Sequence, residues 1–218
     1  MKIIQLALAL LCWATLATTA TAEMSLSLGG GITFDKHEFQ DAGGSASPHF
    51  SLNGQGRVAQ IDLTRRDAFE IAGRPIGASL SLHFNDAGQV DTANNGRGWT
   101  ASLDRSARVR TTRALVTLST PIAQRGDWSL DLGVGLGIAS TDVILRHGTA
   151  TAHQRDTLPH AAISLRAGRT GPDGRTRIWS ELRYRSSPAL ALTYSDGERR
   201  RHELSGLELA AGITFFFE

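Results

Sequence analysis

The stretch from Trp128 to Ile138 reads Trp-Ser-Leu-Asp-Leu-Gly-Val-Gly-Leu-Gly-Ile. Apolar side chains occupy every second position, and small or polar residues lie between them. Successive side chains of a β-strand point to opposite faces of a sheet, so this pattern predicts a strand with one apolar and one polar face. The same period of two recurs at 24–34, 76–84 and 207–217.

Weaker alternation predicts four more strands and brings the total to eight. They lie at about 50–65, 99–118, 161–167 and 178–184. Long polar connections (36–48, 85–98, 141–157 and 188–202) alternate with short ones (66–75, 121–127 and 169–175). Short periplasmic turns opposite long extracellular loops are typical of outer-membrane barrels. We therefore expect an all-β fold, an eight-stranded antiparallel up-and-down transmembrane β-barrel after a cleaved signal peptide.

The fourth predicted strand changes parity along its length. Trp99 and Val109 have the opposite parity to Ala114 and Val116, although both sets are apolar. We expect either a β-bulge near Thr112, which would restore one outward face, or a strand whose upper part leaves the membrane.

Composition excludes several classes of protein. The chain has 218 residues, a formal net charge of +2 and a mean hydropathy of −0.15. No stretch after the N-terminus has the ~18 consecutive apolar residues of a membrane helix, and the balanced charge does not favour nucleic-acid binding. The single cysteine, Cys12, precedes the mature chain, which excludes disulfides and thiol chemistry. Neither a cofactor nor a metal site is expected, because the histidines lack ligand spacing.

The N-terminus has the pattern of a signal peptide. A basic start (Met1-Lys2) precedes an apolar run from Ile3 to Leu16, and Ala20 and Ala22 provide the small residues of a cleavage site. We expect a signal peptide at 1–22, cleaved after Ala22, and a barrel domain at 23–218. A signal anchor is the alternative, although the apolar run is short for a membrane span.

The last strand also carries a family resemblance. Gly212-Ile213-Thr214-Phe215-Phe216-Phe217 resembles the C-terminal signal of outer-membrane barrels, although Glu218 follows where that family usually stops. The stretches 132–137 and 179–184 resemble the fifth and seventh strands of small OmpA-like and opacity-type barrels. The resemblance implies a Gram-negative outer-membrane location in the cell envelope. It also implies that Gly212, Phe215 and Phe217 are the signal read by the barrel assembly machinery.

Charged residues fall on the inward face of the predicted strands. The set is Asp62, Asp131, Arg166, Glu181, Arg183 and Glu208, to which we add Arg108 and Arg110 as further candidates. An eight-stranded barrel is wide enough only for side chains, and buried charges must be paired. We interpret the set as a lumen charge network that plugs the barrel. A small gated pore and a buried acid–base site are the alternatives.

Serine and histidine also share inward faces. Ser81 and His83 lie on the third strand, and His160 and Ser164 on the sixth. Outer-membrane lipid A deacylases carry a His-x-Ser arrangement on one strand, whereas here the order is Ser81-x-His83 and no orienting acid is evident. A lipid A-modifying enzyme is therefore an alternative function, with Ser81 and His83 as candidate catalytic residues. Hydrogen-bonded lumen side chains are the simpler interpretation.

The fourth long connection contains three consecutive arginines, Arg199, Arg200 and Arg201. Arginine forms bidentate contacts with phosphate, so this cluster is a candidate contact for lipopolysaccharide. Pairing with acidic loop residues is the alternative. The sequence as a whole predicts a monomeric outer-membrane protein with a structural or surface-interaction role, no catalysis, and membrane lipids as partners. A soluble periplasmic β-barrel or sandwich is a further alternative.

Overall fold

The structure is a computed structural model that describes residues 23–41, 50–90, 92–94, 99–101, 105–147, 149–193, 195 and 199–217. The expected signal peptide at 1–22, with Ala20 and Ala22, lies outside this part of the chain. Within the described ranges, no helix is both long and apolar enough to cross a membrane.

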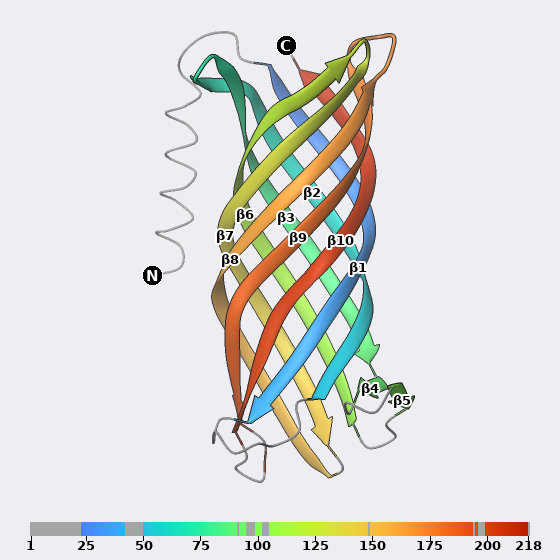
Figure 1. Cartoon of the computed structure of the whole chain (residues 1–218), viewed down its shortest axis with the longest axis vertical. Helices are drawn as coiled ribbons and strands as arrows, with labels where there is room; N and C mark the ends of the chain where they lie inside the picture. The colour runs from blue at the N-terminus through green and yellow to red at the C-terminus, as the bar shows by residue number, and fades with distance from the viewer. Residues whose placement is uncertain are drawn as a thin grey trace.

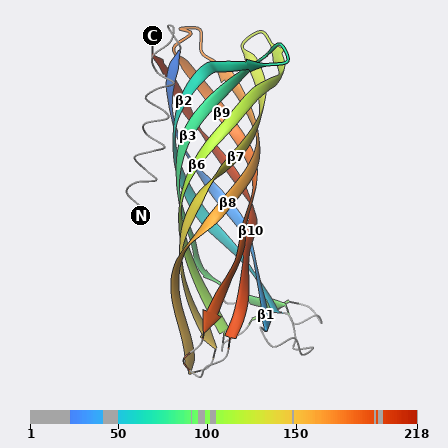
Figure 2. The ribbon, with the colours of Figure 1, turned by 90° about the vertical axis from the view of Figure 1, so that its left-hand side faces the viewer.

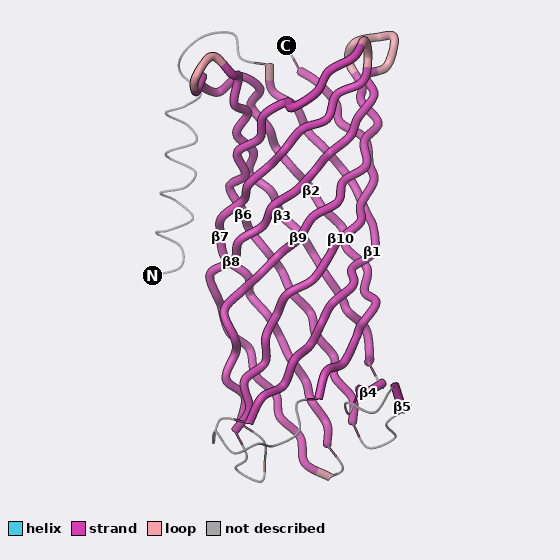
Figure 3. Tube along the Cα trace, viewed as in Figure 1, coloured by secondary structure: helices cyan, strands magenta, loops and turns pink. Residues whose placement is uncertain are grey.

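Eight long strands in the described ranges close into a tall barrel (Figures 1 and 3). They are β1 (Met24–Asp41), β2 (Phe50–Ile71), β3 (Arg74–Val90), β6 (Arg105–Arg125), β7 (Trp128–His147), β8 (Ala150–Thr170), β9 (Thr176–Thr193) and β10 (Arg199–Phe217). Each pairs antiparallel with its neighbours in chain order, and β1 pairs with both β2 and β10 to complete the ring. Closure gives each of these strands a partner on both sides, although β8 pairs with β9 only from Ala161 to Thr170. The prediction of an eight-stranded up-and-down barrel is confirmed.

Two short strands lie outside the ring. β4 (Thr92–Asn94) pairs with β5 (Trp99–Ala101), and β4 also pairs with Ser51 and Leu52 of β2. The fourth ring strand therefore begins at Arg105, so the prediction that it starts at Trp99 was wrong.

The predicted bulge near Thr112 is also absent. The register of β6 runs unbroken against β7 from Arg105 to Pro121, and one parity holds throughout. Val109 is inward and only 3% exposed, whereas it was expected to face outward. Its apolar side chain is accommodated within the lumen, so no bulge is needed to turn it toward the membrane.

The two ends of the barrel differ. At one end, here called the turn end, tight turns join the strands, and the described chain begins and ends there (Figure 1). Ala72 and Gly73 both have positive φ, as a two-residue hairpin turn requires, and Gly126 and Gly174 provide the same conformation in the other two turns. At the opposite end, the loop end, the strands continue well past the predicted limits. For example, β7 continues to His147 and β8 begins at Ala150, although residues 141–157 were expected to form a loop.

A belt of apolar side chains surrounds the middle of the barrel. Its members are exposed although large and hydrophobic, and they include Leu28, Ile32, Ile61, Leu82, Phe84, Val116, Leu118, Leu132, Val134, Leu136, Ile163, Leu165, Leu182, Leu207, Leu209 and Ile213. The alternate positions on the same strands point inward and are mostly polar and buried. An apolar outside around a polar inside is the reverse of a soluble barrel, and it matches a barrel surrounded by lipid. The strands tilt around the long axis, as closure requires (Figure 2).

Candidate functional site

The middle of the lumen is filled by a network of charged side chains. Of the six predicted network residues, the structure brings five into contact: Asp62, Arg166, Glu181, Arg183 and Glu208. The sixth, Asp131, lies nearer the turn end and pairs separately with Arg177 at 2.8 Å. Arg177 also donates to Ser129.

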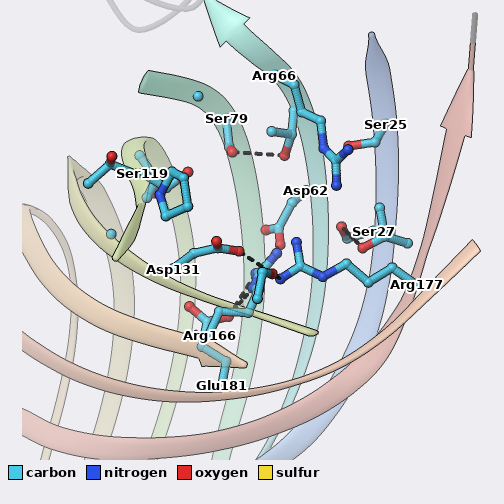
Figure 4. Close-up of a pocket in the computed structure, with 18 of the residues that line it drawn as sticks. Ser25, Ser27, Asp62, Arg66, Ser79, Ser119, Asp131, Arg166, Arg177 and Glu181 are labelled. Carbon is cyan, nitrogen blue, oxygen red and sulfur yellow. Dashed lines mark hydrogen bonds and ion pairs between the residues drawn. The ribbon is translucent and has the colours of Figure 1, made fainter. Parts of the chain in front are cut away.

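The half of the network nearer the turn end is centred on Arg166 (Figure 4). Its Nη2 lies 2.6 Å from Asp62 Oδ2 and 2.7 Å from Glu181 Oε2. One guanidinium thus joins two carboxylates that come from opposite parts of the sequence, β2 and β9. Gln60 donates to both acids, at 3.4 Å to Asp62 and 3.3 Å to Glu181. Arg166 also stacks on the ring of Trp179, 4.4 Å from its centroid.

The half nearer the loop end is centred on Glu208. Arg113 donates to its Oε2 at 2.9 Å, and Arg183 donates to its Oε1 at 3.0 Å. Arg183 also donates to Glu181 at 2.8 Å, so it connects the two halves. His83 lies between them, with Nδ1 3.4 Å from Glu208 and 2.7 Å from Arg183.

These charges are withdrawn from solvent. Asp62 and Glu208 are each 1% exposed, and Arg113 is fully buried. The network contains three carboxylates and, with Arg185 3.8 Å from Glu208, four guanidinium groups. Buried ions are tolerated when each is paired and hydrogen-bonded. Each of the three carboxylates has an arginine partner, and Oδ1 of Asp62 is the carboxylate oxygen that makes no hydrogen bond among the described contacts.

Sequence reasoning missed Arg113, Arg185, Gln60 and Trp179. Arg113 was detectable, because it alternates with Ala114 and Val116, which were correctly assigned to the outer face. The expected parity change near Thr112 hid it. The same error made Arg108 and Arg110 candidates for the lumen, whereas both are exposed on the outside. Their placement follows from the unbroken register of β6.

On the turn side, the network forms the floor of an open vestibule of about 380 Å³. Its walls combine charged side chains with many hydroxyl side chains, among them Ser25, Ser27, Ser79 and Ser119 (Figure 4). Hydrogen bonds between facing strands hold several of these, including Ser27 to Thr214 at 2.7 Å. The vestibule is therefore polar, and it ends at the charges of Asp62, Arg166, Glu181 and Arg183.

On the loop side, apolar side chains lie beyond the network. Val109 of β6 and Val143 of β7 are register partners, and both are almost completely buried, as is Leu190 of β9. Val109 lies closer to the loop end than Arg113 on the same strand. In the part of the barrel that the structure describes, charged groups thus fill the lumen at mid-height, and beyond them these apolar side chains share it with buried polar ones such as Asn85, Thr111 and Thr141.

The candidate serine–histidine pairs do not form as predicted. Ser81 and His83 both face the lumen, but His83 contacts Arg183 and Glu208, and no hydrogen bond joins it to Ser81 among the described contacts. His160 Nδ1 instead lies 2.8 Å from Ser187 Oγ, not near the expected Ser164 partner by any described hydrogen bond. Acids do lie near His83, with Glu208 at 3.4 Å and Asp62 at 3.9 Å, but the described contacts join neither histidine to its candidate serine and so activate neither serine as a nucleophile. The described residues contain no cluster of metal-ligating side chains.

The remaining predicted residues lie at the barrel ends. Gly212, Phe215 and Phe217 belong to β10, and both aromatic rings face outward near the turn end. Arg199, Arg200 and Arg201 begin the same strand at the loop end, but their side chains lie outside the described part of the structure.

No protein-family model matches this chain, and no curated protein matches it. Solved structures do match its fold. Neisserial surface protein A aligns with a TM-score of 0.52 and 10% identity, over 89% of this chain and 97% of its own. The outer membrane protease OmpT from Escherichia coli aligns with a TM-score of 0.54 and 9% identity, over 92% and 99%. A major outer membrane protein from Thermus thermophilus aligns with a TM-score of 0.55 and 12% identity, over 91% and 100%. At these identities, the matches establish the fold alone.

Proposed function

We propose that this chain, an eight-stranded barrel of the small outer-membrane type, is a closed, non-conducting barrel with a structural or surface-interaction role. The observation that carries the proposal is the charge network at mid-lumen. It joins residues of β2, β6, β8, β9 and β10, so it extends across the lumen and does not merely line one side of it.

The energetics of the network support closure. An ion that crossed the lumen would have to separate pairs such as Arg166–Asp62 and Arg183–Glu208, which lie at 2.6 and 3.0 Å. Removing one partner of a buried pair typically costs ~3–5 kcal/mol, so spontaneous opening is rare. The buried side chains of Val109, Val143 and Leu190 occupy further lumen space on the loop side of the network.

Planar bilayer recordings test the proposal. We expect no steady conductance from the wild-type protein. Removing both charges of one buried pair, with Arg183→Ala and Glu208→Ala, creates space and should introduce a measurable leak. The matched control removes an exposed pair on the outer face, Arg110–Asp86, in which Arg110 Nε lies 3.1 Å from Asp86 Oδ2. This control variant should show no conductance. A stable channel in the wild-type protein would overturn the proposal.

A small gated pore is the second candidate, and the vestibule is the observation that favours it. A polar cavity of about 380 Å³ already enters the lumen from the turn end, so only the network and the apolar residues beyond it separate that cavity from the loop end. Brief openings that disappear when a bifunctional thiol reagent joins Gln60→Cys to Glu181→Cys across the lumen would favour this candidate.

A further inference from the structure

A row of alternating charges crosses the outer face of the barrel near the loop end. Arg57, Asp86, Arg110, Asp142 and Arg155 are successive register partners on β2, β3, β6, β7 and β8. Arg57, Asp86, Arg110 and Asp142 alternate with inward, buried neighbours on their strands, and Arg155 has the outward parity of β8, so the whole row faces outward. The Cα atoms of directly opposite residues in an antiparallel pair lie about 4.5–5.5 Å apart. The five charged residues therefore follow one another from strand to strand without a gap.

Arginine is in excess on this face. Two further exposed arginines, Arg108 and Arg146, lie on the loop side of the row and also point outward. We call the five arginines Arg57, Arg108, Arg110, Arg146 and Arg155 the outer arginine face. Among the described side chains, the carboxylates that point outward within this face are Asp86 and Asp142. Asp156 follows Arg155 in the chain, but it has the inward parity of β8.

The two carboxylates are already engaged. Asp86 pairs with Arg110 at 3.1 Å, and Asp142 pairs with His153 at 2.8 Å. Arg57, Arg108, Arg146 and Arg155 have no ion-pair partner among the described residues. With respect to the described side chains, they therefore present guanidinium donors without a carboxylate partner, each able to hold two phosphate oxygens at once.

On β2 and β3 the charged row lies directly beside the apolar belt, and on β6 and β8 a few outward residues such as Thr112, Ala114 and Ala161 separate the two. On β2 only the exposed Ala59 separates Arg57 from the belt residue Ile61 on the outward side, and on β3 the belt residue Phe84 is the outward neighbour of Asp86. An apolar belt fixes the depth of a barrel in the bilayer, so the adjoining row meets the headgroups of one leaflet. Barrels of this type place their short turns in the periplasm and their longer loops outside, which assigns the face to the outer leaflet.

We propose that the outer arginine face binds the phosphate groups of the phosphorylated glycolipid of the outer leaflet, lipopolysaccharide, through its lipid A part. Charge complementarity and depth both favour this occupant: acyl chains would contact the belt while phosphates meet the arginines. The inference rests on the proposed orientation in the outer membrane, but it does not depend on a closed lumen.

Binding of purified lipid A to the full chain in neutral detergent micelles tests the proposal, with dephosphorylated lipid A as the matched ligand. The test variant combines Arg57→Gln, Arg108→Gln and Arg155→Gln. The control variant combines Arg74→Gln, Arg125→Gln and Arg175→Gln, which remove three exposed arginines at the turn end. Heat-modifiable gel migration shows that each variant has a folded barrel.

We expect the test variant to lose about tenfold or more in lipid A affinity, because each charged hydrogen bond lost costs at least that factor. The control variant and the bilayer conductance should not change. The proposal would be overturned if the test variant bound lipid A as tightly as the wild-type protein, or if the control variant lost as much affinity as the test variant. It would also be overturned if the wild-type protein bound dephosphorylated lipid A as tightly as lipid A. Displacement of lipid A by millimolar inorganic phosphate would also overturn it, since it would assign the site to free phosphate.

Discussion

Glu208 is the residue on which most of the lumen network converges. Arg113, Arg183 and Arg185 approach its two carboxylate oxygens, and His83 lies 3.4 Å from one of them. Attraction between charges is strong where water is excluded, but an unpaired charge there is correspondingly costly. The residue therefore offsets several buried positive charges at once.

We expect Glu208→Ala to lower the free energy of unfolding by about 3–5 kcal/mol, since it leaves buried guanidinium groups without their carboxylate. Urea unfolding in detergent micelles, followed by gel migration, measures the change. The control Glu70→Ala removes an exposed carboxylate at the turn end and should stay within about 0.5 kcal/mol of wild type.

A second variant separates charge from packing. Adding Arg113→Ala to Glu208→Ala removes one of the charges left unpaired, so the double variant should recover part of the lost stability. If Glu208→Ala unfolds at the same urea concentration as Glu70→Ala, the network does not contribute this stability to the barrel.

At the scale of the element, the ring of Trp179 on β9 lies over two glycines that are register partners, Gly212 of β10 and Gly29 of β1. Trp179 of β9 is 2% exposed, and a Cβ added to Gly29 of β1 or Gly212 of β10 would contact its ring. Arg166 stacks on the same ring and limits its movement. The glycines are therefore required by the space that Trp179 occupies.

Two adjacent glycines of β1 test this packing. We expect Gly29→Ala to cost about 1–3 kcal/mol of unfolding free energy, because the new methyl group overlaps Trp179. Gly30→Ala points outward, with the backbone oxygen of Val58 3.4 Å away as its nearest neighbour, and should cost less. Unfolding midpoints of the two variants give the comparison, and tryptophan fluorescence should change only in Gly29→Ala. Equal midpoints would mean that the ring moves aside freely.

At the scale of the whole molecule, the barrel can close only after its last strand pairs with its first. β10 pairs with β1 over its full described length, from Phe217 opposite Met24 to Arg200 opposite Asp41. Gly212, Phe215 and Phe217 therefore lie on the strand that completes the fold, which is consistent with their predicted role in assembly.

We expect Phe215→Ala combined with Phe217→Ala to reduce the amount of protein in the outer membrane without preventing its export. Phe34→Ala combined with Phe84→Ala is the control, because these rings are similarly exposed at the other edge of the belt. Fractionation with heat-modifiable migration measures both. Equal outer-membrane levels for the two double variants would remove the argument that the terminal aromatics are an assembly signal.

The sequence by itself determined the class of fold. In runs such as Trp128–Ile138, apolar and small or polar residues alternate over many positions, which only a β-strand places on two separate faces. The even number of these runs, joined by connections that are long and short in turn, specified an up-and-down barrel. Parity also gave the inward positions of Asp62, Arg166, Glu181, Arg183 and Glu208, since side-chain direction in a strand is a local property.

The tertiary structure decided which of these groups meet. Arg166 of β8 and Asp62 of β2 are far apart in sequence, and they come together only because the ring closes and its shear sets their relative height. Arg113, Arg185 and Trp179 joined them for the same reason. The outer arginine face arises likewise from register across five strands, because a row around a barrel follows pairing and leaves no periodic signal in the chain.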